Sequence, residues 1–143
     1  MIYLDNAATG LPKSPGDREA MERALSECGN PSRGSHSLSK NADEVLYRCR
    51  VLLAKQFGTL PEKVVLTKNA TEALNLAIKG LSPKGGEVVT SDLEHNAVLR
   101  PLHALRAARE ITLKQFRTSL SDDSVTVENF RTAVGSTAGL AVV

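Results

Sequence analysis

Small and polar residues gather where one helix of the chain is predicted to begin. Asn69 and Glu72 are three positions apart, the spacing of a capping box with Asn in place of the usual Ser or Thr. That structural interpretation would by itself explain the pattern. The functional alternative is an anion site, because the backbone N–H groups and the dipole of a helix start attract negative charge and the Thr71 hydroxyl adds a donor. The Gly-x-x-x-x-Gly-Lys pattern of nucleotide-triphosphate loops does not occur in this segment.

Two of the three histidines lie in polar loops. His95 follows a predicted buried strand, where an imidazole could stack on a flat heteroaromatic ligand or carry a proton near neutral pH. A solvated loop histidine is an equally good interpretation. His36 lies close to Arg33 in the loop 29–37, and this pair suits either an anionic group or a solvated surface. His103 falls within a predicted helix and is interpreted as structural. Because histidines and cysteines do not cluster, no metal site is expected.

Alternating helices and strands position these loops. Apolar residues recur at i, i+3 and i+4 across 39–57, which predicts a helix with one buried face that includes Cys49 and ends at Gly58. This alternation predicts an α/β fold with a mostly parallel sheet and flanking helices. The other predicted helices cover 17–27, 72–79 (closed by Gly80), 97–108 and 127–134, and the predicted strands cover 64–67, 87–90, 111–116 and a stretch beginning at 140.

The composition excludes several classes of protein. The chain has 143 residues, the size of one domain, and 18 Lys and Arg against 16 Asp and Glu leave a formal charge of +2. That balance, with only 3% aromatic residues, argues against nucleic-acid binding. With no apolar run of about 20 residues and no signal peptide, we expect a cytoplasmic protein that does not enter a membrane. Cys28 and Cys49 are therefore expected to be free thiols.

Four segments match known motifs in order and with compatible spacing: Tyr3-Leu4-Asp5-Asn6-Ala7-Ala8-Thr9, Asn30 to Ser39, Thr67 to Leu76, and Ser91 to Val98. In these segments the chain resembles the class V aminotransferase-like proteins, specifically the cysteine desulfurases and selenocysteine lyases. The resemblance covers essentially the whole chain but only the amino-terminal part, well under half, of a family chain. It implies a partial fold-type-I large domain of the enzymes that use pyridoxal 5′-phosphate (PLP). Residues 1–15 would be an amino-terminal arm and 16–143 a truncated part of that large domain.

The resemblance also implies an activity and a set of site residues. Family members remove sulfur from cysteine, or selenium from selenocysteine, and in the desulfurases this yields alanine and an enzyme persulfide. Ala70 and Thr71 would hold the cofactor phosphate, and His95 would lie over the pyridine ring and assist proton transfer. The remaining implied residues lie near the substrate or near the interface of a homodimer: Asn6, Ala7, Ala8, Thr9, Arg33 and His36.

Several parts of the family's site have no counterpart in this sequence. The family's Schiff-base lysine follows a later turn that contains Ser and His, and the comparable Ser35-His36-Ser37 has no lysine. The Asp that pairs with the pyridine nitrogen and the Cys that accepts sulfur are also missing. The apolar run Leu140–Val143 resembles a strand cut short, so we expect an amino-terminal fragment that is inactive alone. The alternatives are another class V PLP enzyme (kynureninase-, epimerase- or aminotransferase-like) or a non-catalytic α/β interaction module.

Overall fold

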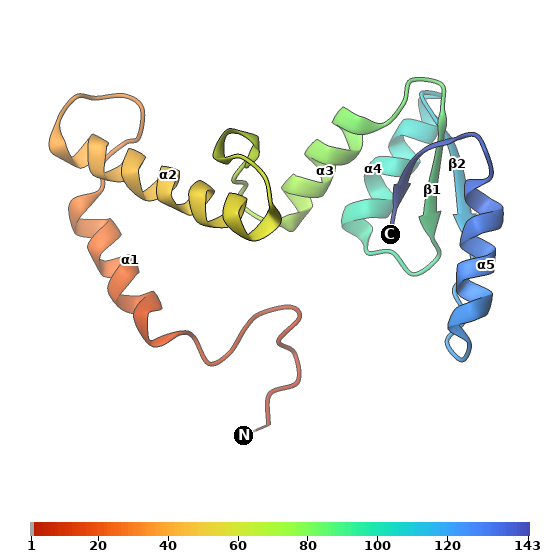
Figure 1. Cartoon of the computed structure of the whole chain (residues 1–143), viewed down its shortest axis with the longest axis horizontal. Helices are drawn as coiled ribbons and strands as arrows, with labels where there is room; N and C mark the ends of the chain where they lie inside the picture. The colour runs from red at the N-terminus through yellow and green to blue at the C-terminus, as the bar shows by residue number, and fades with distance from the viewer. Residues whose placement is uncertain (1) are drawn as a thin grey trace. The chain divides into compact units, whose positions relative to one another are not determined.

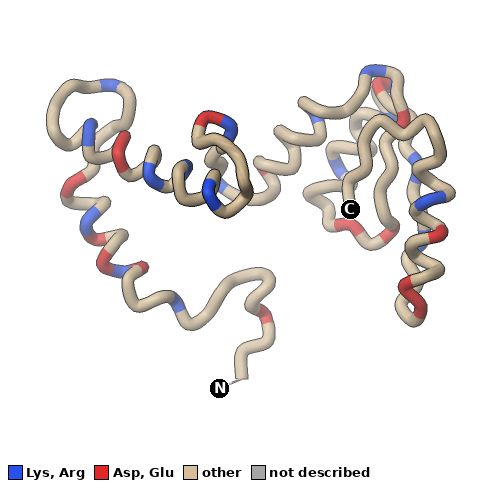
Figure 2. Tube along the Cα trace, in the orientation of Figure 1, with Lys and Arg blue, Asp and Glu red and all other residues tan. Residues whose placement is uncertain are grey.

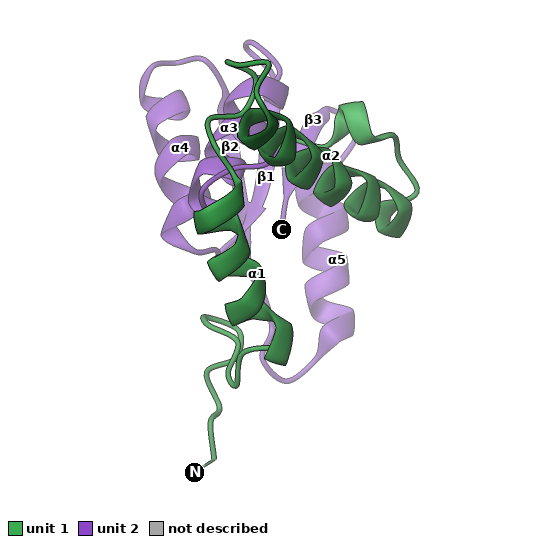
Figure 3. Ribbon diagram, turned by 90° about the vertical axis from the view of Figure 1, so that its left-hand side faces the viewer, with its two compact units in different colours: residues 1–65 green, residues 66–143 purple. Residues whose placement is uncertain are grey.

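The computed structural model describes residues 2–143 and consists of two compact units. Unit 1 extends to Val65 and unit 2 comprises Leu66–Val143 (Figure 3). The division of the sequence into an arm, 1–15, and a following domain stays a prediction. Within residues 2–143, no helix is both long enough and apolar enough to cross a bilayer.

Unit 1 is helical. Helix α1 (Pro15–Glu27) starts with a proline, whose missing N–H is not needed at that position. Helix α2 (Ser37–Phe57) is followed by the short 3₁₀ helix η1 (Pro61–Lys63), and both α1 and η1 contact α2. Gly58 ends α2 in the left-handed conformation, at φ 62°, as predicted from the sequence. Figure 2 shows basic and acidic residues interspersed along α1 and α2.

The prediction of a buried apolar face on α2 is wrong. Val45 is 54% exposed and Leu52 is 61% exposed, and Cys49 is an exposed free thiol rather than a core residue. Only Ser39, Ala42 and Ala54 are buried in this helix. The apolar spacing is real, but α1 and η1 cover only a small part of the stripe. Cys28 is also a free thiol, as expected.

Unit 2 is built on a three-stranded parallel sheet in the order β2–β1–β3, which confirms the predicted α/β fold. The strands are β1 (Glu87–Ser91), β2 (Thr112–Phe116) and β3 (Ala138–Val142). Helix α4 (Asn96–Ala107) connects β1 to β2, and α5 (Asp123–Val134) leads back past β1 to β3. Because parallel crossovers are right-handed, these opposite directions put α4 and α5 on opposite faces of the sheet, as Figures 1 and 3 show.

The core of unit 2 lies on the α4 side of the sheet, where α3 (Ala70–Leu81) packs against α4. Leu102 of α4 and Val88 of β1 have no exposed surface, so both side chains belong to the core between the helices and the sheet. The buried cluster draws on both helices, the central strand and the residue that precedes β2: Ile78, Val88, Val98, Leu102 and Ile111.

Three element predictions in this part of the chain need correction. Residues 64–67 form no strand: Val64 is extended, but the ladder joins only β1, β2 and β3, so it has no partner. Gly80 does not end α3, because its backbone has no left-handed conformation and the helix continues to Leu81. Helix α5 begins at Asp123, before the predicted 127, because Asp122 caps it by accepting a hydrogen bond from the Ser124 N–H at 2.9 Å.

Candidate functional site

The start of α3 is capped as its sequence suggests. Asn69 Oδ1 accepts a hydrogen bond from the Glu72 N–H at 2.9 Å. The Glu72 carboxylate turns back and accepts from the Lys68 N–H at 2.8 Å, one residue earlier than in a standard capping box. The cap therefore uses the amides of Lys68 and Glu72.

Two backbone N–H groups at the start of α3 take no part in this cap. Within residues 2–143, the N–H groups of Ala70 and Thr71 have no protein acceptor, and both residues are exposed. The Thr71 hydroxyl donates no hydrogen bond in this part of the chain either. The groups used for capping therefore differ from those that would bind an anion, and the two interpretations of this sequence do not compete. Three donors at the positive end of a 12-residue helix fit a phosphate group.

His95 caps the next helix. Its Nδ1 accepts a hydrogen bond from the Ala97 N–H at 3.0 Å, and its backbone oxygen accepts from Val98 at 2.8 Å. The imidazole itself is exposed, in the loop that leaves the carboxyl end of the central strand β1. Figure 1 shows that α3 also begins at this end of unit 2, so the structure places Ala70, Thr71 and His95 at one end of the sheet.

Hydrogen bonds join the loop that carries His95 to the end of strand β2 and the residues that follow it. Asp92 Oδ1 accepts from the Thr118 hydroxyl at 2.7 Å and from the Thr118 N–H at 2.9 Å, and the Asp92 N–H donates to the Phe116 oxygen. The hydrogen bond from the Thr118 hydroxyl, with that from its N–H, holds the pKa of the Asp92 carboxyl below its usual value. Ser91 adds a hydrogen bond to Glu94 at 2.7 Å. Sequence analysis missed Asp92, because its partner is 26 positions away.

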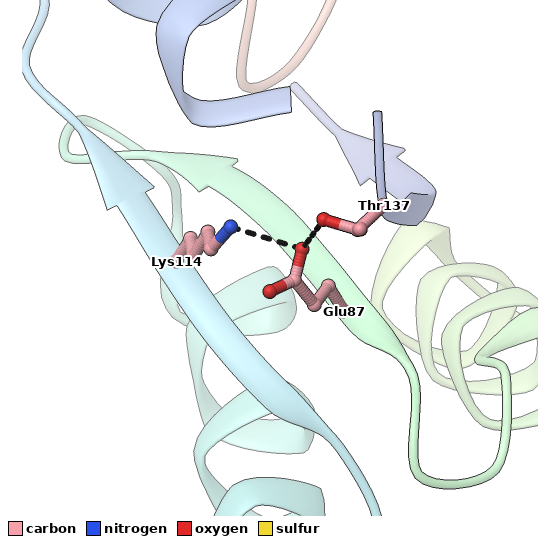
Figure 4. A network of polar contacts seen from close by, with 3 residues as sticks. All are labelled: Glu87, Lys114 and Thr137. Carbon is pink, nitrogen blue, oxygen red and sulfur yellow. Dashed lines mark hydrogen bonds and ion pairs between the residues drawn. The ribbon is translucent and has the colours of Figure 1, made fainter. Parts of the chain in front are cut away.

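A second polar cluster lies where the strands begin. Glu87, the first residue of β1, accepts hydrogen bonds from Lys114 Nζ at 2.9 Å and from the Thr137 hydroxyl (Figure 4). These bonds, first the one from Thr137 and then the one from Lys114, lower the pKa of Glu87. The cluster ties together β1, β2 and the residue before β3. It lies at the opposite end of β1 from His95, so we assign it to the sheet and not to the site.

In unit 1, the opening segment folds on itself. Asn6 Oδ1 accepts from the Leu11 N–H at 3.0 Å, and the Tyr3 hydroxyl donates to the Thr9 oxygen at 2.8 Å. Ala7 and Ala8 are exposed between these contacts. The Asn6 side chain thus stabilises the turn of its own segment by a hydrogen bond to the backbone.

Several hydrogen bonds hold the loop before α2, and this loop carries Arg33. The Ser32 N–H and hydroxyl both donate to Asp43 Oδ1, at 2.9 and 3.2 Å. His36 Nδ1 accepts from the Ser39 N–H at 3.3 Å, so this histidine is also an N-cap. Arg33 lies between these anchors with an exposed side chain that makes no ion pair within residues 2–143.

The candidate residues are therefore divided between the units. Unit 2 carries Ala70, Thr71 and His95, and unit 1 carries the other six: Asn6, Ala7, Ala8, Thr9, Arg33 and His36. Within residues 2–143, no group of three or more His, Cys, Asp or Glu residues is arranged to hold a metal ion.

Comparison with known proteins gives consistent matches along the whole chain. The aminotransferase class-V family model matches residues 2–143. The cysteine desulfurase IscS of Aeromonas hydrophila is 37% identical over 145 residues, covering 88% of this chain and 36% of that protein. IscS of Dictyoglomus turgidum is 39% identical over 109 residues, covering 73% of this chain and 27% of that protein. The chain thus spans about a third of the length of the curated relatives it matches.

Solved structures agree. The apo structure of a cysteine desulfurase from Thermococcus onnurineus NA1 matches 98% of this chain and 35% of its own, with a TM-score of 0.81 and 29% identity. The cystine C-S lyase C-DES, solved with its product cysteine persulfide, matches 94% of this chain and 35% of its own, with a TM-score of 0.77. At 19% identity that second match supports the fold alone.

Proposed function

This chain belongs to the aminotransferase class-V family, and from that premise we propose that it is the amino-terminal portion of a PLP-dependent cysteine desulfurase. Such an enzyme removes sulfur from cysteine as a persulfide and leaves alanine. The observation that carries the proposal is the 37% identity to a curated cysteine desulfurase across 88% of this chain. The resemblance inferred from the four sequence motifs and the family model point to the same family.

The start of α3 supports PLP as the cofactor. The Ala70 and Thr71 N–H groups and the Thr71 hydroxyl would hold its phosphate, because they are the exposed donors that the cap leaves over. His95 would lie beside the pyridine ring, from a loop that Asp92 fixes to the neighbouring strand. PLP, when bound, supplies the electron sink of the reaction.

The residues of unit 1 suit the substrate. Arg33 offers a guanidinium that makes no ion pair within residues 2–143, and this is the group that best binds a carboxylate such as that of cysteine. His36 and the segment Asn6–Thr9 would lie near the same substrate. We further propose a cytoplasmic homodimer in which Arg33 and His36 lie near the subunit interface.

Thr71→Val tests the phosphate assignment. We expect the substitution to weaken binding of inorganic phosphate and of PLP about tenfold or more, because a hydrogen bond to a charged group is lost. Binding can be followed through the amide NMR signals of Ala70 and Thr71 during titration. Thr132→Val, in the exposed part of α5, is the matched control and should leave binding unchanged. Equal affinities of the Thr71 variant and the parent chain would contradict the assignment.

A labelling experiment tests the expectation that this chain is inactive alone. We expect the purified chain to be colourless and to release no sulfide from cysteine, because the family's lysine context is missing. Reduction with borohydride after addition of PLP should label several lysines weakly, as mass spectrometry would show. A single stoichiometric adduct at Lys68, which precedes the α3 cap, together with sulfide release would contradict this expectation.

A further inference from the structure

The two candidate-site histidines make the same unusual contact. His95 and His36 are the N-cap residues of α4 and α2, and in each the ring atom Nδ1 faces a backbone N–H. The distance is 3.0 Å from the Ala97 nitrogen and 3.3 Å from the Ser39 nitrogen. Histidine is not among the residues that usually cap helices, which are Ser, Thr, Asp and Asn.

This contact determines where the proton of the imidazole is. A neutral imidazole has one N–H donor and one acceptor nitrogen, and a backbone N–H can only donate. Since Nδ1 accepts, the proton must be on Nε2. We propose that the Ala97 and Ser39 amides hold His95 and His36 in the Nε2–H tautomer, so that each exposed ring offers a ligand a hydrogen-bond donor and no acceptor.

The constraint is stronger at His95. The Ala97 N–H has Nδ1 of His95 as its acceptor and no second acceptor within residues 2–143. The Ser39 N–H is shared, because it also donates to the backbone oxygen of His36 at 3.1 Å. The third histidine differs from both: the Nδ1 of His103, in the middle of α4, is buried and has no partner within residues 2–143.

The loop sequence leaves room for the ring of His36. A Cβ atom at Gly34 would lie 2.9 Å from Cδ2 and from Nε2 of His36, closer than such atoms approach in proteins. A Cβ atom at Gly29 would lie 3.3 Å from Cε1 of the same ring. Glycine at 34 therefore lets the imidazole reach the Ser39 amide and keeps side-chain atoms away from the nitrogen that carries the proton.

The tautomer limits what each histidine can do. A neutral His95 or His36 donates from Nε2, so the ligand atom it meets must be an acceptor, such as a carboxylate oxygen. Taking up a proton means protonating Nδ1, and the cation then has an N–H on both nitrogens. Its Nδ1–H faces the Ala97 N–H, so the cap is lost. The role of the ligand rests on the proposed function; the tautomer does not.

Through-hydrogen-bond NMR tests the inference on the ¹⁵N-labelled chain itself. At a pH above the range in which histidine titrates, we expect a scalar coupling between the amide nitrogen of Ala97 and Nδ1 of His95. A weaker coupling should join Ser39 and His36. Long-range spectra should place the ring proton of both on Nε2. A proton on Nδ1 of His95, or no coupling to Ala97, would overturn the inference.

Gly34→Ala provides the variant. We expect it to abolish the coupling between Ser39 and His36 and to leave the one between Ala97 and His95 unchanged, since those groups lie in the other unit. Gly80→Ala, where an added Cβ meets nothing within 4 Å, is the control and should change neither. An intact His36 coupling in the Gly34 variant would contradict the steric argument. Because no reaction is measured, failure here leaves the proposed function standing, and a full-length protein without desulfurase activity would leave the tautomers standing.

Discussion

Units 1 and 2 both contain helices with apolar stripes, but only those of α3 and α4, in unit 2, contribute to a buried core. In unit 2 the stripes of α3 and α4 meet each other and the sheet, and residues such as Leu102 and Val88 lose all exposure. In unit 1 the stripe of α2 stays largely exposed, and the order of the loop before it comes from hydrogen bonds around Ser32, His36 and Ser39. Periodicity thus predicts which face of a helix is apolar, while a second layer decides whether that face becomes a core.

The largest expected difference between the units comes from removing a leucine. Leu102→Ala, fully buried in unit 2, should lower the free energy of unfolding by about 2–5 kcal/mol. Leu52→Ala, on the exposed stripe of α2, should change it by less than about 0.5 kcal/mol. Urea unfolding followed by residue-specific amide hydrogen exchange would measure both. Similar losses for the two variants would mean that the stripe of α2 is covered in solution.

Ser39→Ala should show that unit 1 depends on polar contacts. Ser39 has no exposed surface, and its hydroxyl donates to the Asn30 oxygen at 2.8 Å. Losing this bond should destabilise the loop before α2 by about 1 kcal/mol. Both tyrosines, Tyr3 and Tyr47, lie in unit 1 and the chain has no tryptophan, so tyrosine fluorescence reports on this unit. Ser37→Ala, the exposed first residue of α2, is the control, and an equal effect there would contradict the assignment.

The smallest expected effect is a difference in acid sensitivity. The carboxyl groups with lowered pKa values, Glu87, Asp92 and Asp122, all lie in unit 2. Because the folded-state pKa lies below the unfolded-state value, their stabilisation is present above about pH 4 and is lost as the pH falls through the folded-state pKa. The protection of amides from exchange, relative to their intrinsic rates at each pH, should therefore fall in acid more in unit 2 than in unit 1.

Asp92→Asn checks that acid effect at one residue. It removes the titrating carboxyl that accepts two hydrogen bonds from Thr118, so the stability of unit 2 should depend less on pH. Asp123→Asn, whose side chain accepts no hydrogen bond within residues 2–143, serves as the control. An unchanged acid response in the Asp92 variant would show that the Thr118 contact does not contribute.

Local signals in the sequence predicted much of the fold. The end of α2 follows from Gly58, and the cap of α3 follows from Asn69 and Glu72, because these contacts span only a few residues. The predicted strand 64–67 fails because a strand needs a partner, which no local pattern provides. Periodicity wrongly predicts that Cys49 lies in the core, because it identifies the apolar face of a helix but not what covers that face.

The sequence nominates the residues of the candidate site but does not reveal their contacts. Position after a strand or at a helix start pointed to Thr71 and His95. Capping by His95 and His36 was missed because histidine is a rare N-cap, and the bond between Asp92 and Thr118 joins residues 26 positions apart. A glycine beside a histidine, as Gly34 is to His36, is a signal that could be sought in other sequences.

The order of the strands has a consequence for synthesis of the chain. Strand β1 is synthesised before the other two strands but lies in the middle of the sheet. The Thr90 hydroxyl donates to the Val142 oxygen, which is 52 positions later in the chain. Until β2 and β3 have emerged, both edges of β1 lack partners, the state in which nascent chains pair wrongly or aggregate. Closing such a distant pair is also slow compared with forming the helices. We therefore expect α3 and α4 to shield β1 during translation, before the sheet exists.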